Sequence, residues 1–263
     1  MASRTKQKEE ARARRLAEEG ARAERRARVR RLRGIAGIVV AAVVVVVVAI
    51  AISSGGRSVS GLKTGGAASQ TVASVSQLLG GAPQSGAVLG NPSAPVTMTY
   101  YGDLECPICR AFTLDGGFPQ LVAGEVRQGK VKVQYRAFQT ATRNPQTFET
   151  QQVAALAAGK QDKFWDYAEL FYREQGQEDT GYVTNAYLTG LAQQVPGLNL
   201  SEWQSARNDP SLVSQVQSDV AAGTAANVQG TPTLIFSGPK GTASPPQGVP
   251  SYSELQQAIN QVS

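Results

Sequence analysis

The sequence predicts an α/β domain with an inserted group of helices, preceded by a single membrane-spanning helix and a flexible linker. An apolar run of 18 residues at positions 35–52 predicts the membrane span. From residue 96 onward, short β-branched and aromatic segments alternate with helical patterns, which is typical of an α/β sheet domain. Several consecutive helical patterns at about 144–227 separate the second strand from the third and predict the insertion.

The composition excludes several classes of site. The chain has 263 residues, no histidine and only two cysteines, Cys106 and Cys109. Ser-His-Asp and Cys-His hydrolases are therefore excluded, as are zinc sites that need histidine or three or four cysteines from one chain. We expect no metal site, with a four-thiolate site pooled from two chains as the alternative.

The positive charge of the chain lies at its N-terminus. Residues 1–33 carry 13 Lys and Arg against 5 Asp and Glu, a net of +8, whereas the rest carries 13 against 15, a net of −2. A basic arm of this kind can bind nucleic acid. Because an apolar run follows it directly, we instead expect residues 1–34 to lie in the cytoplasm beside a membrane, with no nucleic-acid partner.

Residues 35–52 contain no charged side chain. As a helix they would extend about 27 Å, close to the thickness of the bilayer's hydrocarbon core. Basic residues precede this run, and only Arg57 and Lys63 closely follow it. The expected location is therefore the cell membrane, with one span, a cytoplasmic N-terminus and an extracytoplasmic domain. A cleaved signal peptide and a twin-arginine signal at Arg30-Arg31 are alternatives that also export the domain.

Residues 53–87 predict a flexible linker, because they are rich in Ser, Gly, Ala and Gln without a sustained apolar period. The domain then covers residues 88–263, which is long enough for one hydrophobic core. Its strands are expected at 96–101, 131–138 and 233–236, and its last helix at 252–262 with Ser251 as the N-cap.

The two cysteines stand at the predicted start of a helix, as Cys106-Pro107-Ile108-Cys109 directly after the first strand and its loop. Pro107 suits a first helical turn, where its missing N–H is no loss. The unpaired N–H groups and dipole of a helix N-terminus lower the pKa of a thiol from about 8.5 toward about 3.5–7. We therefore expect Cys106 to be the nucleophile and Cys109 the resolving cysteine of a thiol–disulfide exchange site. A structural disulfide across this turn is the alternative.

Two segments together resemble a known family: Tyr101 to Cys109, which contains the cysteine pair, and Val228 to Phe236, which contains Gly230-Thr231-Pro232. They resemble DsbA-like thiol–disulfide oxidoreductases, and the layout resembles the membrane-anchored members of monoderm bacteria. The resemblance implies a thioredoxin fold with a helical insertion. It also implies a cis peptide bond before Pro232, supporting roles for Pro107, Ile108 and Pro232 in the active site, and substrate binding by Thr231 and Gly230.

The resemblance further implies that the protein forms disulfides in exported proteins and is reoxidised by a quinone-linked membrane partner. No bound cofactor is expected, because the redox-active disulfide Cys106–Cys109 itself carries the two electrons. Strongly oxidising members often have Pro-His between the cysteines, where this chain has Pro-Ile. A reductase or isomerase on the same fold is therefore an alternative, as is a non-catalytic peptide-binding or chaperone module.

Three charged residues flank the cysteines. Asp103 and Glu105 would raise the pKa of Cys106 if their carboxylates lay close to its sulfur. For Asp103 we favour a role in the loop or as a helix cap. Arg110 is the nearest cation in sequence, and is either a partner of the thiolate or a solvated helix residue.

Overall fold

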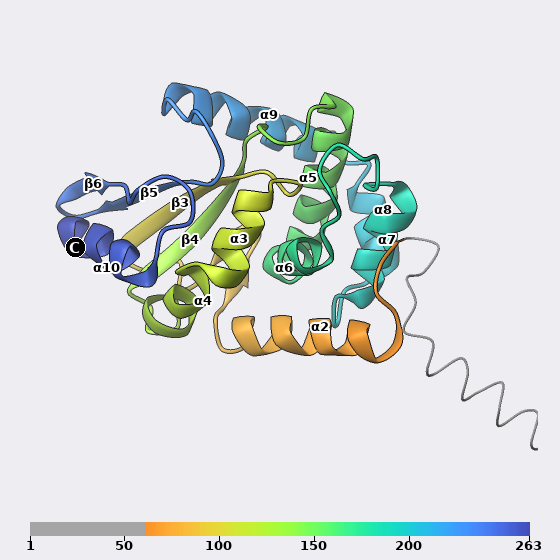
Figure 1. The fold of residues 1–263 in the computed structure, drawn as a ribbon, viewed down its shortest axis with the longest axis horizontal. Helices are drawn as coiled ribbons and strands as arrows, with labels where there is room; N and C mark the ends of the chain where they lie inside the picture. The colour runs from red at the N-terminus through yellow and green to blue at the C-terminus, as the bar shows by residue number, and fades with distance from the viewer. Residues whose placement is uncertain (1–60) are drawn as a thin grey trace, which may run out of the picture. The chain divides into compact units, whose positions relative to one another are not determined.

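The computed structural model describes residues 61–263, which form the ribbon of Figure 1. The predicted cytoplasmic segment at 1–34 and the predicted membrane span at 35–52 lie outside the described residues. Within 61–263, no helix is long and apolar enough to cross a bilayer.

The described strands form one six-stranded sheet in the order β1-β2-β4-β3-β5-β6. Their bounds are Gln84–Ser85 (β1), Val88–Leu89 (β2), Val96–Gly102 (β3), Val131–Ala137 (β4), Thr233–Gly238 (β5) and Gly241–Ala243 (β6). The central strand β3 is parallel to β4 and antiparallel to β5. The three predicted strands are thus confirmed. Strands β1, β2 and β6 were not predicted, since two or three residues are too few to show an alternating pattern.

The connection from β3 to β4 consists of helices α3 (Pro107–Asp115) and α4 (Phe118–Leu121) and a short π-helical turn at Val122–Val126. Gly116 and Gly117 separate α3 from α4. The N–H of Gly117 donates to the carbonyl of Pro250 at 2.9 Å, and a Cβ atom on Gly117 would lie 2.7 Å from the backbone nitrogen of Tyr252. The glycine therefore permits close packing against the start of the last helix, α10 (Tyr252–Val262).

The helical insertion between β4 and β5 is confirmed. It comprises α5 (Pro145–Gly159), α6 (Phe164–Glu174), α7 (Asn185–Gln194), α8 (Leu200–Ala206) and α9 (Pro210–Ala225). The Asn144 side chain accepts the N–H groups of Gln146 and Thr147, and Pro145 occupies the first turn of α5. Asp209 and Pro210 start α9 in the same way.

Helix α6 lies at the centre of the helical part and is buried on nearly all sides. Its spacing assigns Phe164, Ala168 and Phe171, with Trp165 and Tyr172 on the flank, to the packing of the insertion. The structure confirms this, because all five side chains are buried. Helices α2, α3, α5 and α7 all pack against α6, so no solvent-facing flank remains.

The structure differs from the predicted linker at 53–87. Gly65–Leu79 is a helix, α2, which packs beside α6 in the same compact unit as the rest of the described chain (Figure 1). It buries Thr71, Val75 and Leu79, a period of four that the surrounding Ser, Ala and Gln residues obscure in the sequence. Arg127 donates to the carbonyls of Gln77, Leu78 and Gly80 at 2.8–2.9 Å and so holds the end of the helix.

We predict that Gly117→Ala destabilises the protein by about 1–3 kcal/mol, because the added methyl group meets backbone atoms that cannot move aside cheaply. Urea unfolding monitored by circular dichroism measures this loss. Gly66→Ala is the matched control, since a Cβ atom there meets no atom within 4 Å and α2 gains a better helix former. Equal stability of the Gly117 variant and the wild type would contradict the close packing of α10.

Candidate active site

The two cysteines lie at the N-terminus of α3, as predicted. Cys106 is the N-cap residue, and its Sγ accepts the N–H of Cys109 at 3.4 Å. The Cys106 thiol also donates to the carbonyl of Thr231 at 3.3 Å. Cys106 is 4% exposed and Cys109 is fully buried, and both carry free thiols. The geometry is therefore that of a reduced dithiol with one sulfur at the helix start and the other beneath it.

The surroundings shift the two thiols in opposite directions. The Cys109 thiol, followed by Thr231 and by the backbone N–H groups of Cys109 and Ile108, lowers the pKa of Cys106 to about 6 against the opposing effect of burial. Burial, followed by the hydrogen bond to Cys106, raises the pKa of Cys109 well above its usual value. Cys106 is thus a thiolate near neutral pH while Cys109 keeps its proton.

The loop that precedes β5 lies against Cys106. The Thr231–Pro232 peptide bond is cis, and the carbonyl of Thr231 faces the Cys106 sulfur. The Thr233 hydroxyl donates to the carbonyl of Gly230 at 2.7 Å, which closes the turn at the start of β5. The fold thus brings together two sequence segments that are 125 residues apart.

Asp103 is the residue that ties the loops of the site together. Its side chain is fully buried, and its carboxylate has six donors. They are the backbone N–H groups of Glu105, Thr140, Ala141 and Thr142 at 2.9–3.1 Å, the Thr142 hydroxyl at 2.6 Å and the Gln151 amide at 3.3 Å. The Thr140 hydroxyl in turn contacts the Thr231 hydroxyl. Asp103 therefore has the loop role that the sequence favoured, and it links the cysteine loop to the Thr231–Pro232 loop.

Two charged residues next to the cysteines, Glu105 and Arg110, differ in their surroundings. Glu105 is buried, and burial raises the pKa of its carboxyl group. The Arg110 Nε donates to the carbonyl of Tyr172 at 3.1 Å, at the end of α6. Gln175, which directly follows α6, donates through its side-chain amide to the carbonyls of Leu104 and Cys106 at 2.7 and 3.2 Å. The helical insertion thus holds the cysteine loop in place.

The surface next to Cys106 is partly apolar. Pro107 is exposed, and Ile108 is 45% exposed, although it is a large hydrophobic side chain. The residues around the Thr231–Pro232 loop also border a hollow of about 460 Å³, whose lining includes Val228, Gly230 and Ile235. Within residues 61–263, no group of three or more Cys, Asp and Glu side chains is placed to hold a metal ion.

Sequence reasoning missed Thr140 and the buried tyrosines near Cys109. The Tyr100 hydroxyl lies 3.5 Å from the Cys109 carbonyl, 3.3 Å from the Thr113 hydroxyl and 3.4 Å from the Tyr172 hydroxyl. The signal for Thr140 was present, because it follows β4 just as Asp103 follows the adjacent parallel strand β3. The contacts of Tyr172 depend on the packing of the insertion, which no local pattern specifies.

Comparison with known proteins gives consistent matches for this part of the chain. The family model described as thioredoxin matches residues 83–261. The chain belongs to the thioredoxin family. It is 28% identical over 152 residues to disulfide bond formation protein D of Bacillus subtilis (strain 168), a match that covers 56% of this chain and only 65% of that relative.

Solved structures show the same fold. The crystal structure of oxidised BdbD from Bacillus subtilis matches with a TM-score of 0.58 and 24% identity, covering 68% of this chain and 96% of that one. A thioredoxin-like oxidoreductase from Silicibacter pomeroyi DSS-3 matches with a TM-score of 0.54 and 23% identity, covering 71% and 95%. The fold of this thioredoxin-family member, insertion included, is thus similar to that of DsbA-like proteins.

We predict that Asp103→Asn destabilises the protein by roughly 3 kcal/mol, because the amide group has one acceptor oxygen and turns its own N–H groups toward backbone donors. Chemical denaturation measures the loss. Asp115→Asn is the control, since Asp115 is exposed near the end of α3 and its change should stay within about 0.5 kcal/mol. Similar stabilities of the two variants would show that Asp103 does not organise the loops.

We predict that alkylation of Cys106 by iodoacetamide follows a titration with a midpoint near pH 6, and that Cys109→Ala moves the midpoint upward by removing the largest cause of the shift. Because the pKa is lowered on folding, the thiolate stabilises the reduced protein most above about pH 9, and this contribution is lost as the pH falls through about 6. Mass spectrometry of the alkylated peptide gives the rate at each pH. An unchanged midpoint in the Cys109→Ala variant would contradict the assigned cause.

Proposed function

We propose that this chain is a membrane-tethered, extracytoplasmic thiol–disulfide oxidoreductase that forms disulfide bonds in exported proteins. The opposite pKa shifts of Cys106 and Cys109 at the start of α3 are the observation that carries the proposal. The printed name of the Bacillus subtilis relative, disulfide bond formation protein D, supports the same activity.

The exchange proceeds in two steps from the oxidised pair. A substrate thiolate attacks the Cys106 sulfur, which forms a mixed disulfide, breaks the Cys106–Cys109 bond and releases Cys109 as a thiolate that takes up a proton. A second substrate thiolate then attacks the substrate sulfur of the mixed disulfide and releases Cys106 as a thiolate. The substrate loses two electrons and gains a disulfide, and the enzyme ends as the dithiol.

The stabilised Cys106 thiolate favours the oxidising direction. It exists only in the reduced enzyme, so its stabilisation draws the equilibrium toward reduced enzyme and oxidised substrate. It is also a good leaving group in the second step. A reductase would instead need the oxidised state to be the more stable one. Continued turnover requires an oxidant, for which we propose a quinone-linked membrane protein. We propose no bound cofactor, since the Cys106–Cys109 disulfide carries the electrons.

The substrate is proposed to be an extended segment of a reduced protein. Its backbone would pair with Thr231 beside Gly230, as a strand added to an edge, while Pro232 packs near the cysteines. The exposed Ile108 and Pro107 would contact apolar side chains next to the substrate cysteine. The pairing with Thr231 uses backbone groups of the substrate, which suits an enzyme that acts on many sequences.

Residues 35–52 are proposed as the membrane span, with residues 1–34 in the cytoplasm. The packing of Leu62 and α2 shortens the free connection that the sequence predicted. Nine residues, 53–61, lie between the proposed span and Leu62, the first buried side chain among the described residues, and nine residues extend at most about 32 Å. The domain would therefore work close to the membrane surface, within reach of a membrane-bound oxidant.

We predict that Cys109→Ser accumulates a mixed disulfide between Cys106 and a disulfide-containing peptide, because the Cys106 thiolate attacks the peptide disulfide, one peptide thiol leaves and no resolving thiol follows, and that Cys106→Ser accumulates none. Non-reducing electrophoresis and mass spectrometry identify the adduct. For the wild type, equilibration with glutathione should give a reduction potential closer to about −120 mV than to about −270 mV. A potential near the lower value would favour a reductase, and a pair that does not exchange would leave only a binding module.

A further inference from the structure

A cationic hollow lies between α2, the segment before it and helices α3 and α6. Its volume is about 330 Å³, and its lining includes Lys63, Arg110 and Arg173 together with Gln70, Ser74 and Leu114. Residues 61–263 contain 12 Lys and Arg and 15 Asp and Glu. A quarter of the cations of a mildly acidic domain thus line one hollow.

The three cations are held in place but have hydrogen-bonding capacity to spare. Arg110 uses its Nε on the Tyr172 carbonyl, and among the described residues its two terminal nitrogens have no hydrogen-bond partner. Lys63 donates to the Arg173 carbonyl at 3.0 Å and lies 3.5 Å from Glu174. Arg173 donates to Glu169 at 3.3 Å, while its Nε is buried without a partner in residues 61–263.

The carboxylates beneath the hollow only partly balance this charge. Glu169 and Glu174 are both buried and contact Arg173 and Lys63, respectively. Burial raises the pKa of Glu169 to about 8, so this group is largely uncharged near neutral pH. Three cations then face at most two carboxylates, and Arg110 has no acidic partner among the described residues. The net charge of the groups around the hollow is therefore positive.

We propose that the hollow lined by Lys63, Arg110 and Arg173 binds the phosphate group of a glycerophosphate-type anion. Charged donors on three different segments approach from different directions, which suits the tetrahedrally arranged oxygens of a phosphate better than the two coplanar oxygens of a carboxylate. The two terminal guanidinium nitrogens of Arg110 are spaced to donate to two phosphate oxygens. Gln70 and Ser74 on α2 provide polar partners for glycerol hydroxyls, and Leu114 provides an apolar wall.

Such a phosphate group has two sources, an anionic phospholipid headgroup or a soluble phosphate ester. The lipid source rests on the proposed function, in which residues 35–52 cross the membrane. Lys63 then follows the end of the span by 11 residues, at most about 40 Å of fully extended chain. Headgroup binding would orient the domain on the bilayer and add to the single tether.

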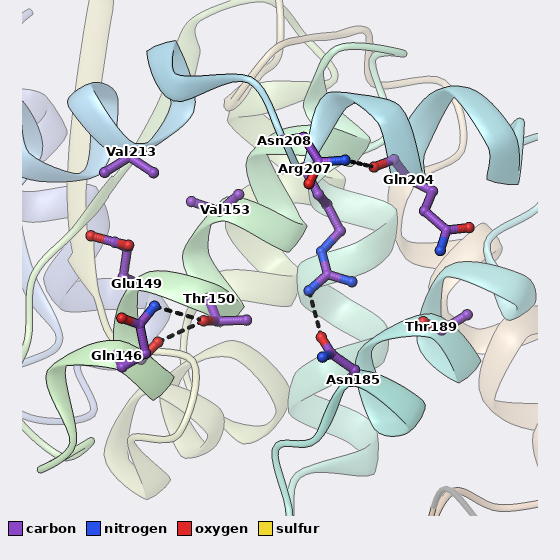
Figure 2. A pocket seen from close by; sticks show the side chains of 10 residues that line it. All are labelled: Gln146, Glu149, Thr150, Val153, Asn185, Thr189, Gln204, Arg207, Asn208 and Val213. Atoms are coloured by element: carbon purple, nitrogen blue, oxygen red, sulfur yellow. Dashed lines mark hydrogen bonds between the residues drawn. The ribbon is translucent and has the colours of Figure 1, made fainter.

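A second hollow of about 500 Å³, between α5, α7, α8 and the start of α9, provides a matched control (Figure 2). It also contains an arginine, Arg207, but this one donates to Asn185 at 2.9 Å and lies 5.0 Å from the ring centre of Trp203. Glu149 lines the same hollow. An arginine with a carboxylate in the same pocket is a poorer phosphate site than three cations together.

Isothermal titration calorimetry of the full chain in a neutral detergent, with glycerol 1-phosphate as the probe, tests the site. We expect saturable binding that weakens at least tenfold in Arg110→Gln and in Lys63→Gln, and that is unchanged in Arg207→Gln. Arg110 is exposed, so its variant should fold, and a thermal melt checks this. Absence of binding, or equal loss in the Arg207 variant, would overturn the assignment.

Nanodiscs distinguish the two sources. If the ligand is a lipid headgroup, hydrogen exchange in peptides 63–74 and 110–114 should be slower in phosphatidylglycerol discs than in phosphatidylcholine discs, and Arg110→Gln should abolish the difference. Calorimetric binding without a lipid-dependent difference would assign the site to a soluble ester. Neither result depends on Cys106, so disulfide exchange measured on the same samples tests the proposed function separately.

Discussion

The buried carboxylate of Asp103 is the interaction on which the arrangement of the active site depends. It stands at the carboxyl end of β3, next to the parallel strand β4, and accepts donors from the loops that follow both strands. A buried charge is tolerated only when hydrogen bonds replace its hydration, and six donors do so here. Each donor also fixes a loop position. The carboxylate thereby sets the distance between the cysteine loop and the segment at Thr140, which contacts Thr231.

The helical insertion completes the site from the opposite side. The end of α6 fixes the cysteine loop through Gln175 and fixes α3 through Arg110. Helix α6 can do this because it is itself held on all sides, with Trp165 stacked on Phe118 at 5.4 Å between ring centres. The insertion is therefore part of the framework that holds the two cysteines, and α2, which packs on α6, adds to the same support.

Sequence reasoning reached the parts of this structure that local patterns determine. The three long strands, the helix starts at Asn144 and Ser251 and the place of Cys106 and Cys109 all follow from periodicity, capping residues and spacing. Helix α2 was missed because Val75 and Leu79 are its only fully buried apolar side chains, and small polar residues surround them. The role of Gly117 and the donors to Asp103 depend on segments that are distant in sequence, so only the assembled fold reveals them.

The absence of histidine from the chain has a physical consequence for the dithiol. No imidazolium can stabilise the Cys106 thiolate, so the Cys109 thiol, Thr231 and backbone N–H groups do so instead. Cys109 can serve as this donor because burial raises its pKa, among tyrosines whose pKa values burial also raises. The two cysteines thus share one proton over a wide pH range, with the charge on Cys106. Oxidation of the pair would remove that shared proton together with the charge, so the stabilisation belongs to the reduced state alone and, in the proposed function, makes a Cys106–Cys109 disulfide an electron acceptor.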